Sequence, residues 1–396
     1  RLLIARLERA PLAVWAGRLQ IKDLAGADEE TRRKVERDRA RRIGLAYQTL
    51  GALLTKAERY DAAIDAFTEA SALFQKHGFV ENVRDVLSQK ALSHDQAGDY
   101  DAALRLFQRL RETYKEANRP ASQAQQLEQM GAIQLKRLNN YFRAEQLYRQ
   151  AHKLYEASGD DVAAANARIS IALARRKLGD LKGALDMLKS IAETARKLDD
   201  QALLARSYTE LGNTYWYRSK YQEAFDYVRR SNDIATRLDD PMQLNINKQL
   251  EGLIYWELNQ FDLAHKALDR AMVYAREAEN RLEVASAWNN KGIIYRREGK
   301  LTEAIDSFNQ ALQIDTKLRS RWGQAYDYRN IGITFRLMGR LEKSAENIRQ
   351  AIDLTRKIGD DINLAKSLSA LGDTLLEMRK LEEAKGAFED ALRIAE

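Results

Sequence analysis

Residues 281–320 read RLEVASAWNNKGIIYRREGKLTEAIDSFNQALQIDTKLRS, and variants of this 40-residue pattern recur along the chain. Nine copies carry a small residue equivalent to Ala304, with steps of 40 residues and a single step of 41. The other eight positions are Ala63, Ala103, Ala144, Ala184, Ala224, Ala264, Ser344 and Ala384. A fixed period of this length is typical of a solenoid, in which each unit buries its apolar face only against its neighbours. We therefore expect a stacked surface whose role is to hold a partner.

Each unit also carries a small residue twelve positions before its alanine, and six of these nine residues are glycine. The positions are Gly51, Ala91, Ala132, Ala172, Gly212, Gly252, Gly292, Gly332 and Gly372. Glycine inside a helix costs roughly 1 kcal/mol relative to alanine. Its repetition indicates that another side chain or backbone segment packs tightly against this position.

The units read as pairs of helices joined by short turns. Glycine or asparagine in turns such as 98–100 and 299–301 tolerates the left-handed conformation that ends a helix. Short polar residues at multiples of 40 can cap the next helix, namely Asp160, Asp200, Asp240, Asn280, Ser320 and Asp360. We expect first helices near 44–57, 81–97, 121–138, 161–178, 201–218, 241–258, 281–298, 321–338 and 361–378. Second helices are expected near 60–76, 100–117, 141–157, 181–197, 221–237, 261–277, 301–317, 341–357 and 381–395.

The spacing of small, aromatic and alanine positions resembles the tetratricopeptide repeat (TPR). One unit shows it at Gly292, Tyr295, Leu301, Ala304, Phe308 and Ala311. The usual unit has 34 residues, whereas each unit here has about six more and lacks the closing proline. In these two respects the units resemble the long-helix repeats of Pins-type polarity adaptors and of many bacterial regulatory arrays. The resemblance covers residues 44–396 and implies an all-α fold, an α-solenoid superhelix of about nine helix-turn-helix units. HEAT and armadillo repeats have similar periods, but they do not share this register.

Residues 1–43 lie outside the repeat, and we expect them to form a helical lead-in or cap. Leu2, Leu3, Ile4, Leu7, Leu12, Val14 and Trp15 would supply an apolar face. The segment TRRKVERDRARR at 31–42 is densely basic, and either contacts an anionic surface or forms a solvated helix with local ion pairs. Units are expected to begin near 44, 81, 121, 161, 201, 241, 281, 321 and 361. The last helix reaches the end of the sequence without a polar capping helix, so we expect a fragment whose uncapped end offers a surface for self-association.

Several classes of protein are disfavoured by the sequence. No apolar run approaches the ~18 residues that span a membrane, and the chain has no cysteine. It has no Walker loop and no GxSxG, HExxH or GxGxxG motif, and its four histidines are not spaced as metal ligands. We therefore expect a binding protein without cofactor or metal, and not an enzyme. A cytoplasmic location is expected, although the lack of cysteine also suits an exported compartment.

The resemblance implies that first helices line a concave surface and offer five ligand-facing places per unit. These lie six and three residues before the small position, and one, four and five after it; steps of three and four keep them on one helix face. At the place four after the small residue, six consecutive units carry Lys136, Arg176, Trp216, Trp256, Arg296 and Arg336. The remaining candidates are Arg137, Lys177, Arg206, Asn213, Tyr217, Gln249, Asn289, Arg297, Tyr326 and Arg329.

Neighbouring like charges ~10 Å apart and two exposed tryptophans would be unfavourable on an empty surface. An acidic ligand with apolar anchors would remove both the charge repulsion and the exposure of the rings. Arginine can donate two parallel hydrogen bonds to a carboxylate, and tryptophan is enriched at binding hot spots. We therefore expect a protein-interaction scaffold whose groove binds an acidic peptide with apolar anchors, or a partner domain. The alternative interpretation is that the arginines pair with acids of neighbouring helices while the tryptophans pack internally.

Two further functions stay open. A regulatory or sensor region would control an effector domain attached in a longer chain. A nucleic-acid-binding solenoid would suit the net charge of +7 and the aromatic residues among the arginines. Because that charge is modest and the basic residues are balanced on the outer faces, nucleic acid is the weakest of the three.

Overall fold

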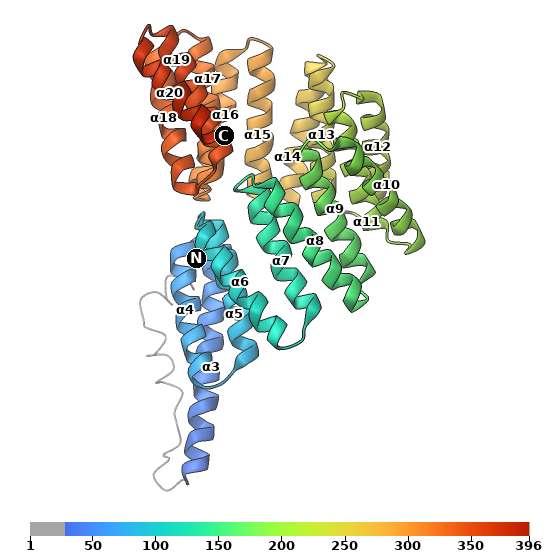
Figure 1. Cartoon of the computed structure of the whole chain (residues 1–396), viewed down its shortest axis with the longest axis vertical. Helices are drawn as coiled ribbons and strands as arrows, with labels where there is room; N and C mark the ends of the chain where they lie inside the picture. The colour runs from blue at the N-terminus through green and yellow to red at the C-terminus, as the bar shows by residue number, and fades with distance from the viewer. Residues whose placement is uncertain (1–27, 396) are drawn as a thin grey trace. The chain divides into compact units, whose positions relative to one another are not determined.

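The computed structural model describes residues 28–395, which form eighteen helices joined by short turns and contain no strand. These helices fall into two units by their packing, with the division between Asn118 and Arg119. Within each unit, every helix packs against the helices that precede and follow it, so the expected all-α arrangement of helix pairs is confirmed (Figure 1).

Unit 1 contains four helices, α3 (Glu29–Lys56), α4 (Tyr60–Lys76), α5 (Val80–Ala97) and α6 (Tyr100–Glu116). The two first helices, α3 and α5, also contact each other. The start expected for the first helix, residue 44, differs from the structure, because α3 begins fifteen residues earlier and runs through residue 43 without a break. Asp28 caps it, with its side chain 2.7 Å from the amide of Thr31. The basic segment 31–42 is therefore part of this helix, whereas the apolar residues expected to cap the solenoid lie outside the described residues.

Unit 2 contains seven helix pairs. Their first helices are α7 (Pro120–Lys136), α9 (Asp161–Lys177), α11 (Gln201–Tyr217), α13 (Pro241–Glu257), α15 (Arg281–Arg297), α17 (Arg321–Leu337) and α19 (Asp361–Glu377). Their second helices are α8 (Tyr141–Ser158), α10 (Leu181–Lys197), α12 (Tyr221–Arg237), α14 (Phe261–Glu277), α16 (Leu301–Lys317), α18 (Leu341–Ile358) and α20 (Leu381–Ala395). Consecutive first helices contact each other from α9 to α19, so neighbouring pairs are joined directly through their first helices.

Helix starts follow the caps that the sequence predicts. Each of the six polar residues at multiples of 40 accepts a hydrogen bond from the amide three residues later, as Asp200 does from Leu203 at 2.9 Å. Helix ends use left-handed residues, including Gly98, Asn139, Gly179 and Gly299 with φ between 53° and 90°. Local chemistry therefore sets the helix boundaries in unit 2 to within one or two residues of expectation.

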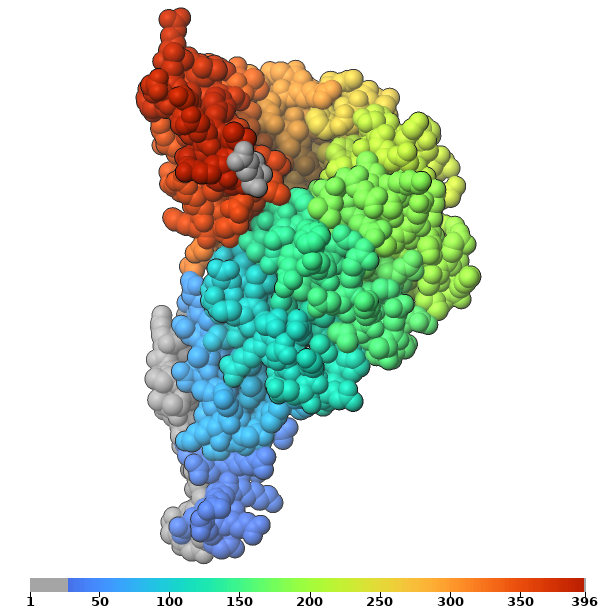
Figure 2. Space-filling view, viewed as in Figure 1, coloured from blue at the N-terminus to red at the C-terminus, as the bar shows by residue number. Residues whose placement is uncertain are grey.

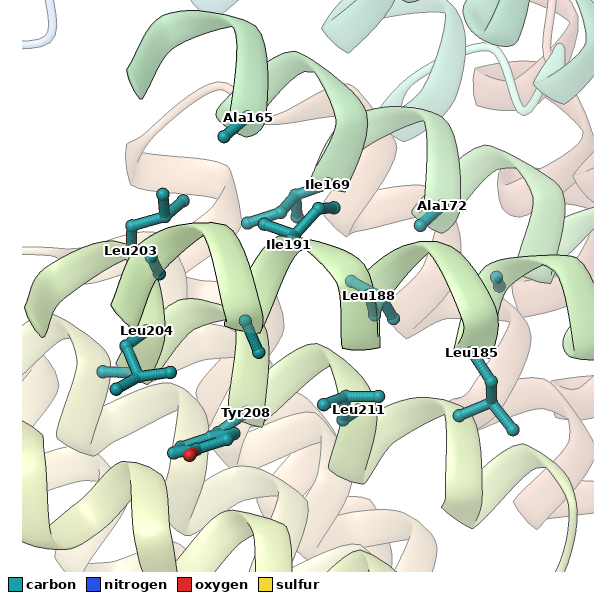
Figure 3. Close-up of a cluster of buried hydrophobic side chains, with 14 of the residues drawn as sticks. Ala165, Ile169, Ala172, Leu185, Leu188, Ile191, Leu203, Leu204, Tyr208 and Leu211 are labelled. Atoms are coloured by element: carbon teal, nitrogen blue, oxygen red, sulfur yellow. The ribbon is translucent and has the colours of Figure 1, made fainter. Parts of the chain in front are cut away.

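The apolar core consists of clusters that follow one another along the stacked pairs of each unit. In the best-filled cluster, Ile169 of α9, Leu188 and Ile191 of α10, and Leu211 of α11 are fully or almost fully buried (Figure 3). Each helix pair thus buries its apolar side chains partly within itself and partly against the next pair. Burial at about 25 cal/mol per Å² of apolar surface is the main stabilising contribution of such contacts.

The small residue of each unit faces the side chain four positions after the repeat alanine. A Cβ atom added to Gly292 would lie 2.6 Å from the Phe308 ring, and one added to Gly51 would lie equally close to Phe67. The predicted close approach at this position is therefore confirmed, and it explains why helix-disfavouring glycine recurs there.

One unit has a different register from the one expected. The residue that faces the Tyr148 ring is Gly131, not its neighbour Ala132. Helix α7 ends at Lys136, five residues after Gly131, just as α9 ends at Lys177, five residues after Ala172. The single 41-residue step thus adds its extra residue in the turn after α7, and Lys136 corresponds to Lys177 rather than to Arg176.

The winding of unit 2 brings its first and last helix pairs together. Asn139, in the turn after α7, donates its Nδ2 to both carboxylate oxygens of Asp360, the cap of α19, at 3.0 Å. The Tyr141 hydroxyl donates a hydrogen bond to Oδ1 of the same Asn139 side chain at 2.9 Å. Asp360 is fully buried. We name this the closing contact; in Figure 2 the teal start of unit 2 adjoins its orange and red end.

Candidate functional site

A cavity of about 540 Å³ lies inside unit 2, behind the closing contact. One side is formed by the C-terminal ends of α7 and α9, and the other by the N-terminal parts of α15 and α17 with the end of α16. Its volume lies within the range of about 300–1,000 Å³ that is usual for ligand pockets. The cavity exists only because the solenoid turns back on itself, since its two sides are separated by more than 100 residues in the sequence.

The α7 and α9 side of the cavity is basic. Lys136 and Lys177 are exposed and line it together with Arg137 and the buried Arg176. Surrounding protein lowers the pKa of Lys136 by desolvation, and the positive charges of Arg137 and Arg206 lower it further, against an opposing effect of Glu283 and Glu210. Lys177 donates its Nζ to the Tyr217 hydroxyl at 2.6 Å. An anionic group placed here would relieve the repulsion among these cations.

The opposite side carries a pair of buried carboxyl groups, Asp315 of α16 and Asp327 of α17, which are only 6% and 1% exposed. Burial raises the pKa of both groups, and for Asp327 the neighbouring Asp315 charge raises it further. Asp327 accepts a hydrogen bond from the Asn289 side-chain amide. Two carboxyl groups this close disfavour the doubly ionised state of the pair.

Aromatic and apolar side chains complete the cavity. Trp322 and Tyr326 of α17 stack with their ring centroids 5.6 Å apart and nearly parallel. The indole nitrogen of Trp322 is buried without a hydrogen-bond partner. Leu135, Leu173 and Leu282 contribute apolar surface. The site therefore combines a basic side, an acidic side and an apolar wall.

Six of the residues predicted from the sequence line this cavity: Lys136, Arg137, Arg176, Lys177, Asn289 and Tyr326. The structure thus brings together candidates that lie up to 190 residues apart in the sequence. Arg336 lines a separate hollow of about 600 Å³ near the last pair, beside Phe388 and Leu392.

Many of the predicted residues instead connect consecutive first helices. We call these contacts first-helix bridges. They join Arg176 to Glu210 and Thr214, Lys177 to Tyr217, Arg206 to Asn166, Gln249 to Glu283, Asn289 to Asp327, Arg296 to Asn330, Arg329 to Asn363, and Arg336 to Glu377. The alternative interpretation, in which arginines pair with neighbouring helices, describes Arg176 and Arg336. Arg296 and Arg329 bond to asparagines, and burial lowers the pKa of both guanidinium groups.

The two tryptophans are half-buried, and their indole nitrogens are buried without a partner. Trp216 packs against the cluster of Leu250 and Ile254, and Trp256 against that of Leu268 and Ile294. The remaining candidates are the half-buried Asn213, the exposed Tyr217, whose ring meets Trp216 edge-on, and Arg297, whose guanidinium lies 5.1 Å above the Trp256 ring. These side chains lie outside the cavity lining and contribute mainly to packing.

The acidic side of the cavity was missed in the sequence. Its signal was nevertheless present in the repeat, because Asp315 stands where three preceding units carry Ala195, Ala235 and Ala275. Asp327 likewise stands where neighbouring units carry Ala287 and Ser367. Two buried aspartates at positions where the nearest preceding units carry alanine are costly to bury. This cost distinguishes the two positions from their counterparts in those units.

Between residues 28 and 395, no helix is long and apolar enough to cross a membrane. In the same range, no three or more histidine, cysteine or acidic side chains are grouped so that they could hold a metal ion.

Comparison with solved structures shows the same fold at low sequence identity. A Rap protein complexed with competence and sporulation factor is 12% identical with a TM-score of 0.59, over 89% of this chain and 97% of the Rap chain. The apo quorum sensor NprR from B. thuringiensis is 14% identical with a TM-score of 0.54, over 93% and 100%. Yeast Tom70 is 15% identical with a TM-score of 0.52, over 89% and 92%.

No curated protein matches the chain in a sequence comparison. The family model described as tetratricopeptide repeat does match, at residues 42–116, 163–237, 245–317 and 325–396. These matches include well over half of the chain and coincide with the helix pairs described above. The chain therefore belongs to the tetratricopeptide repeat family.

Proposed function

We propose that this protein is an interaction scaffold that holds an acidic peptide segment with apolar side chains inside the cavity of unit 2. The observation that carries the proposal is the pair of exposed lysines, Lys136 and Lys177, at the ends of two adjacent first helices and within one cavity. A ligand carboxylate would interact with both cations in a partly desolvated place, where charge-assisted hydrogen bonds are strongest.

The apolar part of the ligand would pack on the opposite wall. Trp322 offers a large ring surface, and Leu173 and Leu282 lie at the same cavity. Aromatic anchors in concave, largely desolvated sites contribute most of the affinity in peptide complexes. The Rap structure, which is complexed with competence and sporulation factor, has the same fold and supports a ligand-binding role for this architecture.

A regulatory form of this function is also supported by one observation. The cavity is lined by α7 and α9 at the start of unit 2 and by α15 to α17, and the closing contact joins the turn after α7 to the start of α19. A bound peptide would therefore favour the closed arrangement over an open one, and the resulting change in the positions of the ends would be available to an attached domain.

Catalysis and nucleic-acid binding are not part of the proposal. Among the residues that line the cavity there is no histidine or cysteine. Arg176 and Arg336, which a polyanion would need, are engaged with Glu210 and Glu377 instead.

A retention experiment tests this function. Immobilised protein is incubated with a pool of four-residue peptides that carry leucine or phenylalanine in the first two positions and aspartate or glutamate in the last two. We expect members of the pool to be retained, and the double variant Lys136→Glu, Lys177→Glu to lose this retention because two cations become anions.

The matched control is Lys182→Glu with Lys197→Glu, which makes the same change of charge at exposed lysines of α10 outside the cavity. This control should retain peptides like the wild type. Equal retention by the two double variants, with unchanged helical circular dichroism, would contradict the proposal.

A further inference from the structure

The two sides of the cavity carry opposite charges. Lys136 and Lys177 lie on one side, and the Asp315–Asp327 pair lies on the other. A purely acidic ligand would use only the first side and would leave a buried carboxyl pair facing it. We therefore expect the same ligand to carry a second group that interacts with the two aspartates.

Several independent features mark the pair as more than a structural element. The three units before carry alanine at the position of Asp315, and the two adjacent units carry Ala287 and Ser367 at that of Asp327. Oδ2 of Asp327 is buried without a hydrogen-bond partner, although Oδ1 accepts from Asn289. The Trp322 ring lies at the same cavity, and its indole nitrogen also lacks a partner.

Space for the Asp315 carboxylate is made by glycine. A Cβ atom at position 323 would lie 2.2 Å from Oδ2 of Asp315, so Gly323 lets the carboxylate approach the first turn of α17. Helix N-termini stabilise negative charge. The pair is therefore held in place from its own side and forms part of the cavity lining.

The chemical group that suits this arrangement is a primary ammonium. Three N–H donors on one compact charge can bridge two carboxylates, and an aromatic face beside them adds cation–π attraction. A guanidinium group is larger and planar, and it is better suited to two parallel hydrogen bonds with a single carboxylate. A divalent cation would need more oxygen ligands than the pair and its neighbours provide.

Resting on the proposed function, we infer that the Asp315–Asp327 pair is the subsite for a primary ammonium group of the ligand. The cavity then takes a zwitterionic segment, with its ammonium on α16 and α17 and its carboxylate on α7 and α9. Two sources provide this chemistry, the free amino terminus of a short peptide and a lysine side chain within a longer one.

Burial and mutual repulsion raise the pKa of both carboxyl groups, so binding of an ammonium in this mode would release a proton from the pair. The ammonium takes the place of that proton, and the proton passes to the buffer. The charged and titratable groups that face the same cavity are Lys136, Arg137, Arg176, Lys177, Glu283 and Tyr326. Asn289 and Ser320 contact the pair by hydrogen bonds and do not titrate.

The test compares three otherwise matched pools of the four-residue peptides described above. One pool has free amino termini, the second is acetylated, and the third is acetylated and carries lysine in its first position. We expect either the free or the lysine pool to bind about tenfold or more tightly than the acetylated pool, because a charge-assisted hydrogen bond is gained. The preferred pool identifies the source of the ammonium.

The preference should disappear in Asp327→Asn and in Asp315→Asn, while binding of the acetylated pool is kept. Asparagine keeps the size of the side chain and removes a buried charge, so both variants should fold. Calorimetry of the best peptide in two buffers of different ionisation enthalpy should show release of up to one proton by the wild type and none by Asp327→Asn.

Two results would overturn the inference, and they differ from each other. Equal binding of all three pools by the wild type, still lost in Lys136→Glu with Lys177→Glu, would remove the ammonium subsite and leave the proposed function standing. Failure of the wild type to bind any pool would remove both.

Discussion

At the scale of single residues, a recurring tight constraint in this fold is the contact between the small position of a pair and the side chain opposite it. Gly332 shows it most clearly, because a Cβ atom there would lie 2.5 Å from Cγ1 of Ile348 and 3.0 Å from the Ser344 carbonyl oxygen. Ile348 is β-branched and stiff, and a backbone oxygen has little freedom to move. Alanine is accommodated at Ala172, where the facing residue is the more adaptable Leu188.

We predict that Gly332→Ala destabilises the protein although alanine is the better helix former. Overpacking costs about 1–3 kcal/mol, which exceeds the gain of roughly 1 kcal/mol in helix propensity. The matched control is Gly386→Ala in α20, where a Cβ atom meets nothing within 4 Å. Thermal unfolding followed by circular dichroism should show opposite shifts. Stabilisation by both substitutions would show that the close approach at position 332 is relaxed in solution.

At the scale of helices, the first-helix bridges determine how each pair sits on the next. The buried Arg176 spans from α9 to Glu210 and Thr214 of α11, at 2.8 and 3.2 Å. Arg336 makes the equivalent bridge from α17 to Glu377 of α19 at 2.6 Å, in a place where both side chains are better hydrated. The same kind of contact thus occurs in two environments within one molecule.

This pair of bridges gives a direct comparison of buried and exposed ion pairs. We predict that Arg176→Ala lowers the free energy of unfolding by about 3 kcal/mol, because Glu210 loses the partner of its largely buried charge. Arg336→Ala should cost about 1 kcal/mol or less, because water replaces the lost cation. Urea unfolding measures both. Equal losses would mean that hydration does not distinguish the two bridges.

At the scale of the whole of unit 2, the closing contact makes this solenoid different from a simple linear stack. In a linear array each repeat interacts only with its neighbours, and stability is close to a sum of local terms. Here Asn139 and Asp360, 221 residues apart, are joined by hydrogen bonds. The Asp360 side chain is bonded to Asn363, which in turn accepts from Arg329 at 2.8 Å, so the contact extends into α17. The first and last pairs of the unit are therefore coupled directly.

We predict that Asn139→Gly weakens this coupling without unfolding the helices. Glycine keeps the left-handed backbone that Asn139 adopts at φ 53°, so only the side-chain contact is lost. Hydrogen exchange should increase at the turn after α7 and at the first turn of α19, and stay unchanged in α12 to α14.

The control for this prediction is Asn259→Gly, at an exposed turn with the same left-handed backbone, φ 56°. It should leave exchange at α19 as in the wild type. If Asn139→Gly behaves like this control, the two ends of unit 2 are not held together by the closing contact in solution.

The sequence by itself determined the helix pairs, their caps, their turns and the close contact at the small position. These features depend on residues at most about twenty positions apart, so a 40-residue period makes them visible. It also grouped candidate residues on one face of the first helices, because helical spacing keeps them together. The register of the third pair was wrong by one residue, since an insertion can be placed at any point of the turn until the facing ring of Tyr148 is known.

Only the tertiary structure decided which of these candidates bridge helices and which line a cavity. That distinction depends on the rotation between consecutive pairs, which accumulates over seven pairs until α7 meets α19. Small changes in packing between two pairs alter the accumulated rotation, and no local sequence pattern encodes this rotation. Asp360 illustrates both levels: its place in the repeat predicted the cap of α19, whereas its bond to Asn139 could be found only in the folded chain.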